Sequence, residues 1–217
     1  MSNIFGGKDK IGGAIVENDR VSRYSGGWGQ LLQRMRGGES LRILDIGPTS
    51  STNINFITSL GHSIYLANLV EDAARHEWIL PQEDGAGGRF DVERFLALHL
   101  DFSGRGFDVV LFWDTADFLP PELLSPVLQR IHSVMMPDGQ MLAMFHPANG
   151  GFTPGTAKAD FHRYHLTDQT TVDVQRVGDY PQLANYTNRQ IERLLAKFKG
   201  FHFYLAKDNM REVMVTR

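Results

Sequence analysis

The stretch that decides the fold is Leu41-Arg42-Ile43-Leu44-Asp45-Ile46-Gly47-Pro48-Thr49-Ser50-Ser51-Thr52-Asn53-Ile54-Asn55-Phe56. Its first residues form a short apolar run around Asp45, and apolar residues then return at helical spacing from Ile54 onward. This pattern predicts a buried strand, a tight turn at Gly47 and the N-terminus of a helix. In doubly wound α/β domains, ligands bind beyond the carboxyl ends of such strands. The turn is therefore the first candidate for a binding site.

Composition sets the class of protein around this stretch. The chain has 217 residues, of which 42% are hydrophobic and 22% are charged, and this is typical of one globular α/β domain. A net charge of -3 and a pI near 6.2 indicate neither a nucleic acid partner nor an anionic membrane. No cysteine is present, which excludes disulfides and thiolate metal sites. The N-terminal residues lack the hydrophobic region of a signal peptide, and no apolar run reaches the roughly 18 residues that span a bilayer. We expect a cytoplasmic protein.

Further elements follow in an order that suits a parallel sheet. Residues 107–114 form a nearly continuous apolar run, as a central strand buried on both faces should. Residues 121–134 carry apolar positions on a helical period after Pro120 and Pro121. The remaining predictions are a strand at 63–67, a helix from about Asp91, a turn at 136–140, a strand at 141–145, a helix at 188–197 and a terminal antiparallel hairpin at 201–206 and 211–216. Residues 98–102 fit either a short strand or the end of the preceding helix.

Taken together, Asp45, Gly47 and this order of elements resemble the class I S-adenosylmethionine-dependent methyltransferases. In that family the first motif runs acid-x-Gly-x-Gly-x-Gly, and here Thr49 and Ser51 stand in the places of the second and third glycines. The most specific match is Phe-Asp-Val-Val at 107–110, an apolar helix, Met-Pro-Asp-Gly at 136–139 and a strand. The resemblance implies a single domain over 1–217, with a Rossmann-like seven-stranded sheet in the order 3-2-1-4-5-7-6 and helices on both faces.

The resemblance also implies S-adenosylmethionine as the cofactor. Asn68 follows the second strand, where related proteins place an acidic residue that holds the ribose hydroxyls. Asp101 stands where the family has an acid that accepts a hydrogen bond from the adenine amino group. The cofactor-binding residues implied are Asp45, Gly47, Thr49, Asn68, Asp101, Phe102 and Trp113. We expect that Gly47→Val abolishes cofactor binding and leaves the fold largely intact.

Methyl transfer from a sulfonium donor is a direct displacement, so the protein mainly supplies alignment and a dry pocket. Candidate catalytic residues lie at the carboxyl ends of the fourth and fifth expected strands: Asp114 and His146. Candidate substrate-contacting residues are Tyr24, Tyr164 and His165. The last two lie in residues 146–185, which we interpret as an insertion that forms substrate walls, and residues 1–20 are interpreted as a flexible arm. A structural hydrogen-bonded role for His146 and a packing role for Tyr24 remain open alternatives.

A metal centre is not predicted. His162 and His165 are three residues apart, but no third ligand lies at a fixed spacing from them. Asp114 and Asp117 with Asn149 do not match the spacing of metal-dependent O-methyltransferases.

These observations leave three hypotheses for function. The first is an S-adenosylmethionine-dependent methyltransferase that acts on an unidentified small molecule. The second is a non-catalytic protein of the same fold that binds a nucleoside-like ligand or a protein partner, because Thr49, Ser51 and Asn68 depart from the family pattern. The third, a nicotinamide-dependent oxidoreductase, needs three glycines in the turn, and the chain has only Gly47 there.

Overall fold

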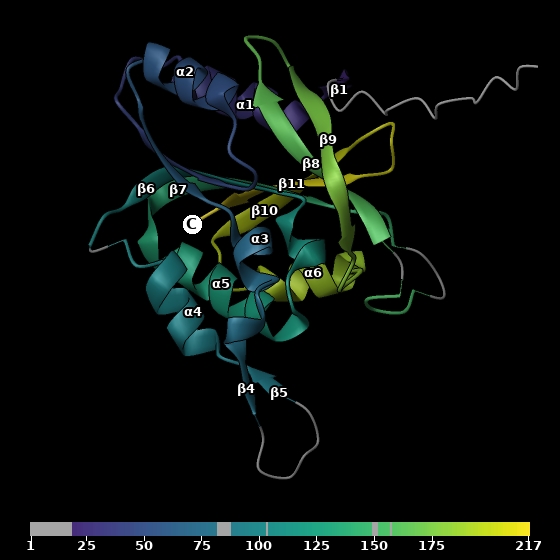
Figure 1. Cartoon of the computed structure of the whole chain (residues 1–217). Helices are drawn as coiled ribbons and strands as arrows, with labels where there is room; N and C mark the ends of the chain where they lie inside the picture. The colour runs from purple at the N-terminus through teal and green to yellow at the C-terminus, as the bar shows by residue number, and fades with distance from the viewer. Residues whose placement is uncertain (1–18, 82–87, 103, 149–151, 157) are drawn as a thin grey trace, which may run out of the picture.

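The computed structural model describes residues 19–81, 88–102, 104–148, 152–156 and 158–217 (Figure 1). Most of the expected arm, most of the glycine-rich loop at 84–88, and Asn149 lie outside the described residues.

A six-stranded sheet in the order β10-β11-β7-β6-β2-β3 forms the centre of the molecule. Its strands are β2 (Arg42–Ile46), β3 (Ser63–Ala67), β6 (Phe107–Trp113), β7 (Met135–Phe145), β10 (Gly200–Leu205) and β11 (Arg211–Thr216). Strands β3, β2, β6 and β7 pair in parallel, whereas β11 is antiparallel to both β7 and β10. The mostly parallel sheet with a terminal antiparallel hairpin is therefore confirmed.

The expected seventh strand, next to β3, is wrong for the part of the chain that the structure describes. Helix α4 (Val92–His99) includes the first two of the positions 98–102 where that strand was one alternative, and residues 100–102 form no strand. Leu100 is fully buried, so the segment serves the core rather than the sheet edge. A second difference concerns β7, which begins at Met135 and contains the expected turn as an irregularity in its pairing with β6.

Local signals explain where the helices begin and end. The Asp91 side chain accepts a hydrogen bond from the backbone N–H of Arg94 and caps α4, as the sequence indicates. Helix α2 (Ser51–Ser59) is capped by Ser50, whose side chain accepts a hydrogen bond from the backbone N–H of Asn53. Gly61, just after α2, has a φ of +82°, a conformation that glycine adopts without strain.

Helices cover both faces of the sheet (Figure 1). Helices α1 (Gly26–Met35) and α2 enclose one hydrophobic core, and α3 (Leu69–Ala73), α4, α5 (Pro121–Val134) and α6 (Asn188–Leu194) enclose the other. Two 3-10 helices, η1 (His76–Trp78) and η2 (Thr115–Phe118), and the short pair β4 (Ile79–Pro81) and β5 (Gly88–Phe90) complete this part. Within the described ranges, no helix is long and apolar enough to cross a membrane.

A second sheet, in the order β1-β9-β8, crosses the carboxyl ends of the main strands. It consists of β1 (Arg20–Tyr24), β8 (Lys158–Leu166) and β9 (Thr171–Pro181), so the end of the expected arm and much of the insertion at 146–185 are regular strand. Side chains of β8 reach both cores, since Tyr164 belongs to the α1–α2 side and Phe161 to the other. This hairpin covers the edge at which the sequence places the ligand.

Candidate functional site

Asp45, at the end of β2, is buried and fully engaged by the protein itself. Its Oδ1 accepts a 2.6 Å hydrogen bond from the Trp113 indole Nε1, and its Oδ2 accepts a 3.0 Å bond from Asn53 Nδ2. Burial raises the pKa of Asp45 to about 6, although the two hydrogen bonds act in the opposite direction. The carboxylate therefore anchors the end of β6 and the start of α2.

The Trp113 ring occupies the space beside Gly47. A Cβ atom on Gly47 would lie 3.1 Å from Cδ1 of Trp113, which is tighter than ordinary van der Waals contact. On its other side the indole stacks on Tyr164, with ring centroids 4.7 Å apart and planes 2° from parallel. The φ of Trp113 is +43°, which is strained for a bulky residue and is the type of outlier often found at functional sites.

Hydrogen bonds tie the N-terminus of α2 to β8. The Ser50 hydroxyl lies 2.8 Å from His165 Nδ1. Asn53 Nδ2 donates to the Tyr164 carbonyl at 3.0 Å, and Asn53 Oδ1 accepts from the Leu166 N–H at 2.8 Å. These polar groups are buried, and they take up the donors and acceptors that a ligand would use at this turn. In this arrangement the Trp113 ring and these hydrogen-bonded side chains surround Gly47.

The residues expected at the nucleoside part are arranged differently. Asn68 follows β3 and donates from Nδ2 to Glu71 at 2.8 Å, while its buried Oδ1 has no hydrogen-bond partner among the described residues. Such an acceptor is costly unless a ligand or water supplies a donor. Asp101 is exposed, and the Phe102 ring packs edge-on against Phe107 with centroids 4.8 Å apart. Asn68 Oδ1 can therefore accept a hydrogen bond from a ligand, whereas the Trp113 ring lies directly beside Gly47.

Two aspartate–histidine pairs lie at the carboxyl ends of β6 and β7. Asp114 Oδ2 is 3.2 Å from His162 Nδ1, and Asp117 Oδ2 is 3.1 Å from His146 Nδ1. Both carboxylates are buried, and the outer oxygen of each has no hydrogen-bond partner among the described residues. Burial raises the pKa of Asp117, an effect that His146 partly offsets. Burial lowers the pKa of His146, but contact with Asp117 outweighs this and leaves it raised.

A cavity of about 850 Å³ lies beside these pairs, between the second sheet and the β10–β11 turn. Its lining residues are Asp19, Val21, Ser22, Arg23, Tyr24, His162, Tyr164, Val174, Arg176, Ala206, Lys207, Asp208 and Met210. Tyr24 and Tyr164 were both predicted to contact substrate, and both line it. His165 does not line this cavity, because it is buried against Ser50 and Gln175. Thr49 is exposed at the turn.

Charged side chains line one part of this cavity. Arg23 donates to Asp208 at 2.6 Å and to the buried Glu212 at 2.9 Å. Burial lowers the pKa of Arg23, but the two carboxylates outweigh this and leave it raised. The cavity therefore joins an apolar wall to fixed charges, which is the usual character of a small-molecule site.

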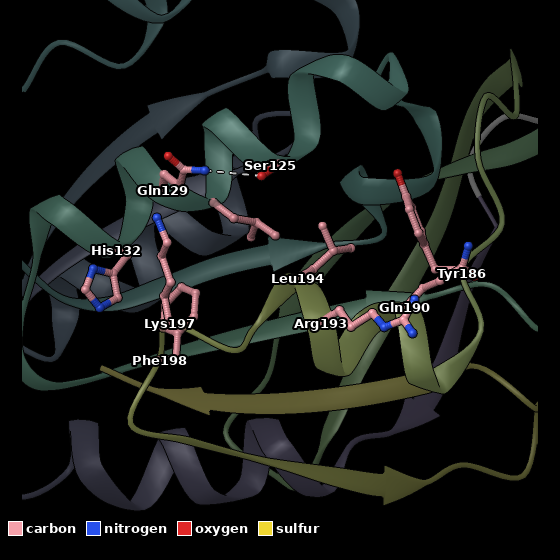
Figure 2. Close-up of a pocket in the computed structure, with 10 residues that line it drawn as sticks. Ser125, Gln129, His132, Tyr186, Gln190, Arg193, Leu194, Lys197 and Phe198 are labelled. Carbon is pink, nitrogen blue, oxygen red and sulfur yellow. Dashed lines mark hydrogen bonds between the residues drawn. The ribbon is translucent and has the colours of Figure 1, made fainter.

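A second cavity, of about 330 Å³, lies between α5 and α6 (Figure 2). Figure 2 shows Lys197, which follows α6, extending toward Gln129 and His132 of α5, whereas Arg193 and Gln190 lie near Tyr186. Among the residues that line it, none was predicted to be functional.

Sequence reasoning named two residues of the site without their partners and missed a third. His162 was considered together with His165, but positions three residues apart on a strand point to opposite faces, and β8 also has an irregularity between Phe161 and His162. Asp117 was considered only as a general candidate, and its pairing with His146 joins two different strand ends. Asn53 looked like an ordinary residue in the first turn of a helix. Only its burial would have distinguished it.

No protein-family model matches this chain, and no curated protein matches it. Solved structures resemble it at low identity. A methyltransferase from Streptomyces caelestis is 12% identical with a TM-score of 0.48, over 88% of this chain and 93% of the other. The 1,6-didemethyltoxoflavin-N1-methyltransferase of Burkholderia thailandensis, described with bound S-adenosylhomocysteine, is 16% identical with a TM-score of 0.46, over 88% and 77%.

A candidate O-methyltransferase from Nostoc punctiforme is 12% identical with a TM-score of 0.46 and covers 88% of this chain. This chain spans only 55% of the Nostoc protein. In this chain, β11 is inserted antiparallel between β7 and β10 at one edge of the mostly parallel sheet.

Proposed function

We propose that this protein is an S-adenosylmethionine-dependent methyltransferase that acts on a small molecule bound in the cavity of about 850 Å³. The observation that carries the proposal is the position of this cavity. It lies between the second sheet and the β10–β11 turn, and one of its lining residues, His162, pairs with Asp114 at the carboxyl end of β6. Ligands of a doubly wound sheet bind at that edge. The insertion then acts as a substrate wall, as the sequence predicts, through Tyr164 and Val174.

In this reaction the chain itself binds the substrate, excludes water from the site and supplies a proton acceptor. The donor supplies an activated methyl group, so the substrate needs alignment and, for a hydroxyl or amine, loss of a proton. His162 lines the cavity, and Asp114 behind it orients the ring through Nδ1. His162 Nε2 is therefore the atom best placed to accept a proton from a bound substrate.

Binding of the donor requires Trp113 to leave the space beside Gly47. The strained φ of Trp113 favours such a change, because a ligand that takes the place of the indole lets the backbone relax. Asn68 and Asp101 provide the nucleoside contacts in the proposal, and the unpartnered Asn68 Oδ1 is available to a hydroxyl.

Calorimetry and fluorescence with S-adenosylhomocysteine test the donor site together. We expect heat of binding for one site per chain and a change in tryptophan fluorescence. In Trp113→Phe the fluorescence change should be much smaller while binding remains. Trp78 lies in the other hydrophobic core, and Trp28, which shares a core with Trp113, packs against Phe56 of α2. Absence of heat in both proteins at millimolar ligand would overturn the donor proposal.

A second candidate function is a non-catalytic protein of this fold. The observation that favours it is the closed seam of Ser50, Asn53 and His165, which fills the turn with the protein's own hydrogen bonds. This candidate predicts no binding of S-adenosylhomocysteine by the wild type or by Trp113→Phe, together with unchanged stability in its presence.

A further inference from the structure

Three potential metal ligands converge next to His162, a residue that lines the large cavity. Asp114 follows β6, His146 follows β7 and His162 lies on β8, and one ligand atom from each lies within 4.8 Å of the others. We infer that these three side chains bind one divalent transition-metal ion of the Zn²⁺ type. Two imidazoles and one carboxylate form a ligand set that such ions prefer, and Mg²⁺ does not. The inference does not depend on the methyl donor.

The distances are close to those of a metal site. Ligand atoms about 2.1 Å from one Zn²⁺ ion lie roughly 3.4 Å apart in a tetrahedron. The spacing of up to 4.8 Å therefore contracts by small side-chain rotations. His162 is already 3.2 Å from Asp114 through its Nδ1, so only His146 has to approach.

An unpartnered carboxylate oxygen is the second observation that indicates a cation. The Asp114 side chain is only 1% exposed, and its Oδ1 has no hydrogen-bond partner among the described residues. Asp117 is also buried nearby, and its Oδ1 likewise has no hydrogen-bond partner among the described residues. A doubly charged cation at the three ligands neutralises the buried carboxylates of Asp114 and Asp117. Without it, only protonated histidines can balance these two negative charges.

Asp117 occupies the place of an outer partner that orients a histidine ligand. Its Oδ2 accepts hydrogen bonds from the backbone N–H of His146 at 2.8 Å and from His146 Nδ1 at 3.1 Å, so Nε2 is the nitrogen left for a metal. Its carbonyl in turn accepts from the N–H groups of Leu183 and Ala184 at 2.9 and 3.0 Å. Asp117 is thus a positioning residue that is itself held by the backbone.

One of the three ligands connects the site to the cavity. His162 and Tyr164 both line it, and three protein ligands leave at least one site for water or substrate. A metal there would bind an oxygen-containing small molecule, such as a phenolate, a hydroxyl compound or a carboxylate, and polarise that oxygen as a Lewis acid.

The first test uses the wild-type chain after treatment with a chelator. We expect calorimetry with ZnCl₂ to show one site, and MgCl₂ to show none. X-ray absorption of the zinc-loaded protein should show imidazole scattering from two histidines. A spectrum without imidazole ligands would overturn the inference, and so would the absence of zinc binding. Neither readout depends on binding of a methyl donor, so failure here is distinguishable from failure of the proposed function.

Matched histidine variants locate the site. His162→Gln should weaken zinc binding by at least about a hundredfold, whereas His202→Gln, at an exposed position on β10, should leave it unchanged. Asp117→Asn should weaken it by about 10–100-fold, as loss of an outer partner does. Circular dichroism checks that each variant is folded. Equal zinc affinity in His162→Gln and the wild type would overturn the assignment, and the absorption spectrum of the wild type decides the matter if a variant does not fold.

Discussion

The rings of Trp113 and Tyr164 stack with their centroids 4.7 Å apart and their planes 2° from parallel. Trp113 ends β6, and Tyr164 lies on β8, in the hairpin that crosses the sheet. The stacked pair therefore covers the turn at Gly47. The indole is also held by its hydrogen bond to Asp45. Access of any ligand to the turn therefore depends on this pair of rings.

Gly47→Val should destabilise the fold, which corrects the expectation from sequence that only ligand binding would suffer. Even a Cβ would lie 3.1 Å from Trp113 Cδ1, and a branched side chain forces the indole away. We expect a loss of about 1–3 kcal/mol in the free energy of unfolding, measured with denaturant. In a Trp113→Ala background the same substitution should cost almost nothing, and an equal cost in both backgrounds would contradict the contact.

Asn53→Ala should loosen α2 from β8. The substitution removes the partners of Asp45 Oδ2, the Tyr164 carbonyl and the Leu166 N–H, all buried. We expect a loss of at least about 2 kcal/mol in unfolding free energy. Asn55→Ala, at an exposed position of the same helix, is the matched control and should change stability by no more than about 0.5 kcal/mol. Similar effects at both positions would show that the seam contributes little.

Asp45 should make the protein less stable as the pH rises from about 4 to 6. Its pKa in the folded state is about 6, above the ordinary 3.8, so the folded state binds the proton more tightly across this interval. The stability that this proton contributes is fully present below pH 3.8, the ordinary pKa, and is lost above about pH 6, the pKa in the folded state. The difference amounts to roughly 3 kcal/mol at most.

The comparison with Asp45→Asn isolates this effect. Unfolding free energies of the two proteins should diverge in slope between pH 4 and 6 and run parallel above pH 7. Parallel slopes throughout would mean that Asp45 titrates near its ordinary pKa.

Gly27→Ala should destabilise the packing of α1 on the sheet. A Cβ there would lie 2.6 Å from Leu142 Cδ1 and 2.7 Å from Glu212 Oε1, and Glu212 also accepts a 2.5 Å hydrogen bond from the Gly27 N–H. We expect a loss of about 1–3 kcal/mol, read as a lower thermal midpoint. Gly200→Ala, where a Cβ meets nothing within 4 Å, should leave the midpoint nearly unchanged. An unchanged thermal midpoint in Gly27→Ala would show that α1 can shift away from β11.

Much of the fold could be predicted because each signal is local. The apolar run before Trp113, the cap at Asp91 and the glycine after α2 each indicate their element without reference to the rest of the chain. The expected seventh strand failed because residues 98–102 suit a helix end as well as a strand. The long β8–β9 hairpin was only partly recognised, since its first strand carries mixed polar and apolar residues on both faces.

Less of the candidate site could be predicted. Asp114 and His146 were found because they directly follow apolar strands, and Tyr164 because it lies in the expected insertion. His162 and Asp117 gained their importance only from neighbours that are distant in the chain. No spacing rule connects positions on three different strand ends.

The sequence by itself determined the order of strands and helices and the location of the Asp45–Gly47 turn, because hydrophobic period, caps and turn residues act over a few positions. Only the tertiary structure decided that Trp113 and Tyr164 fill this turn and that Asp114, His146 and His162 meet beside a cavity. The physical reason is that the space beyond the end of a strand is filled by side chains from other segments of the chain. Their packing depends on contacts across the whole chain.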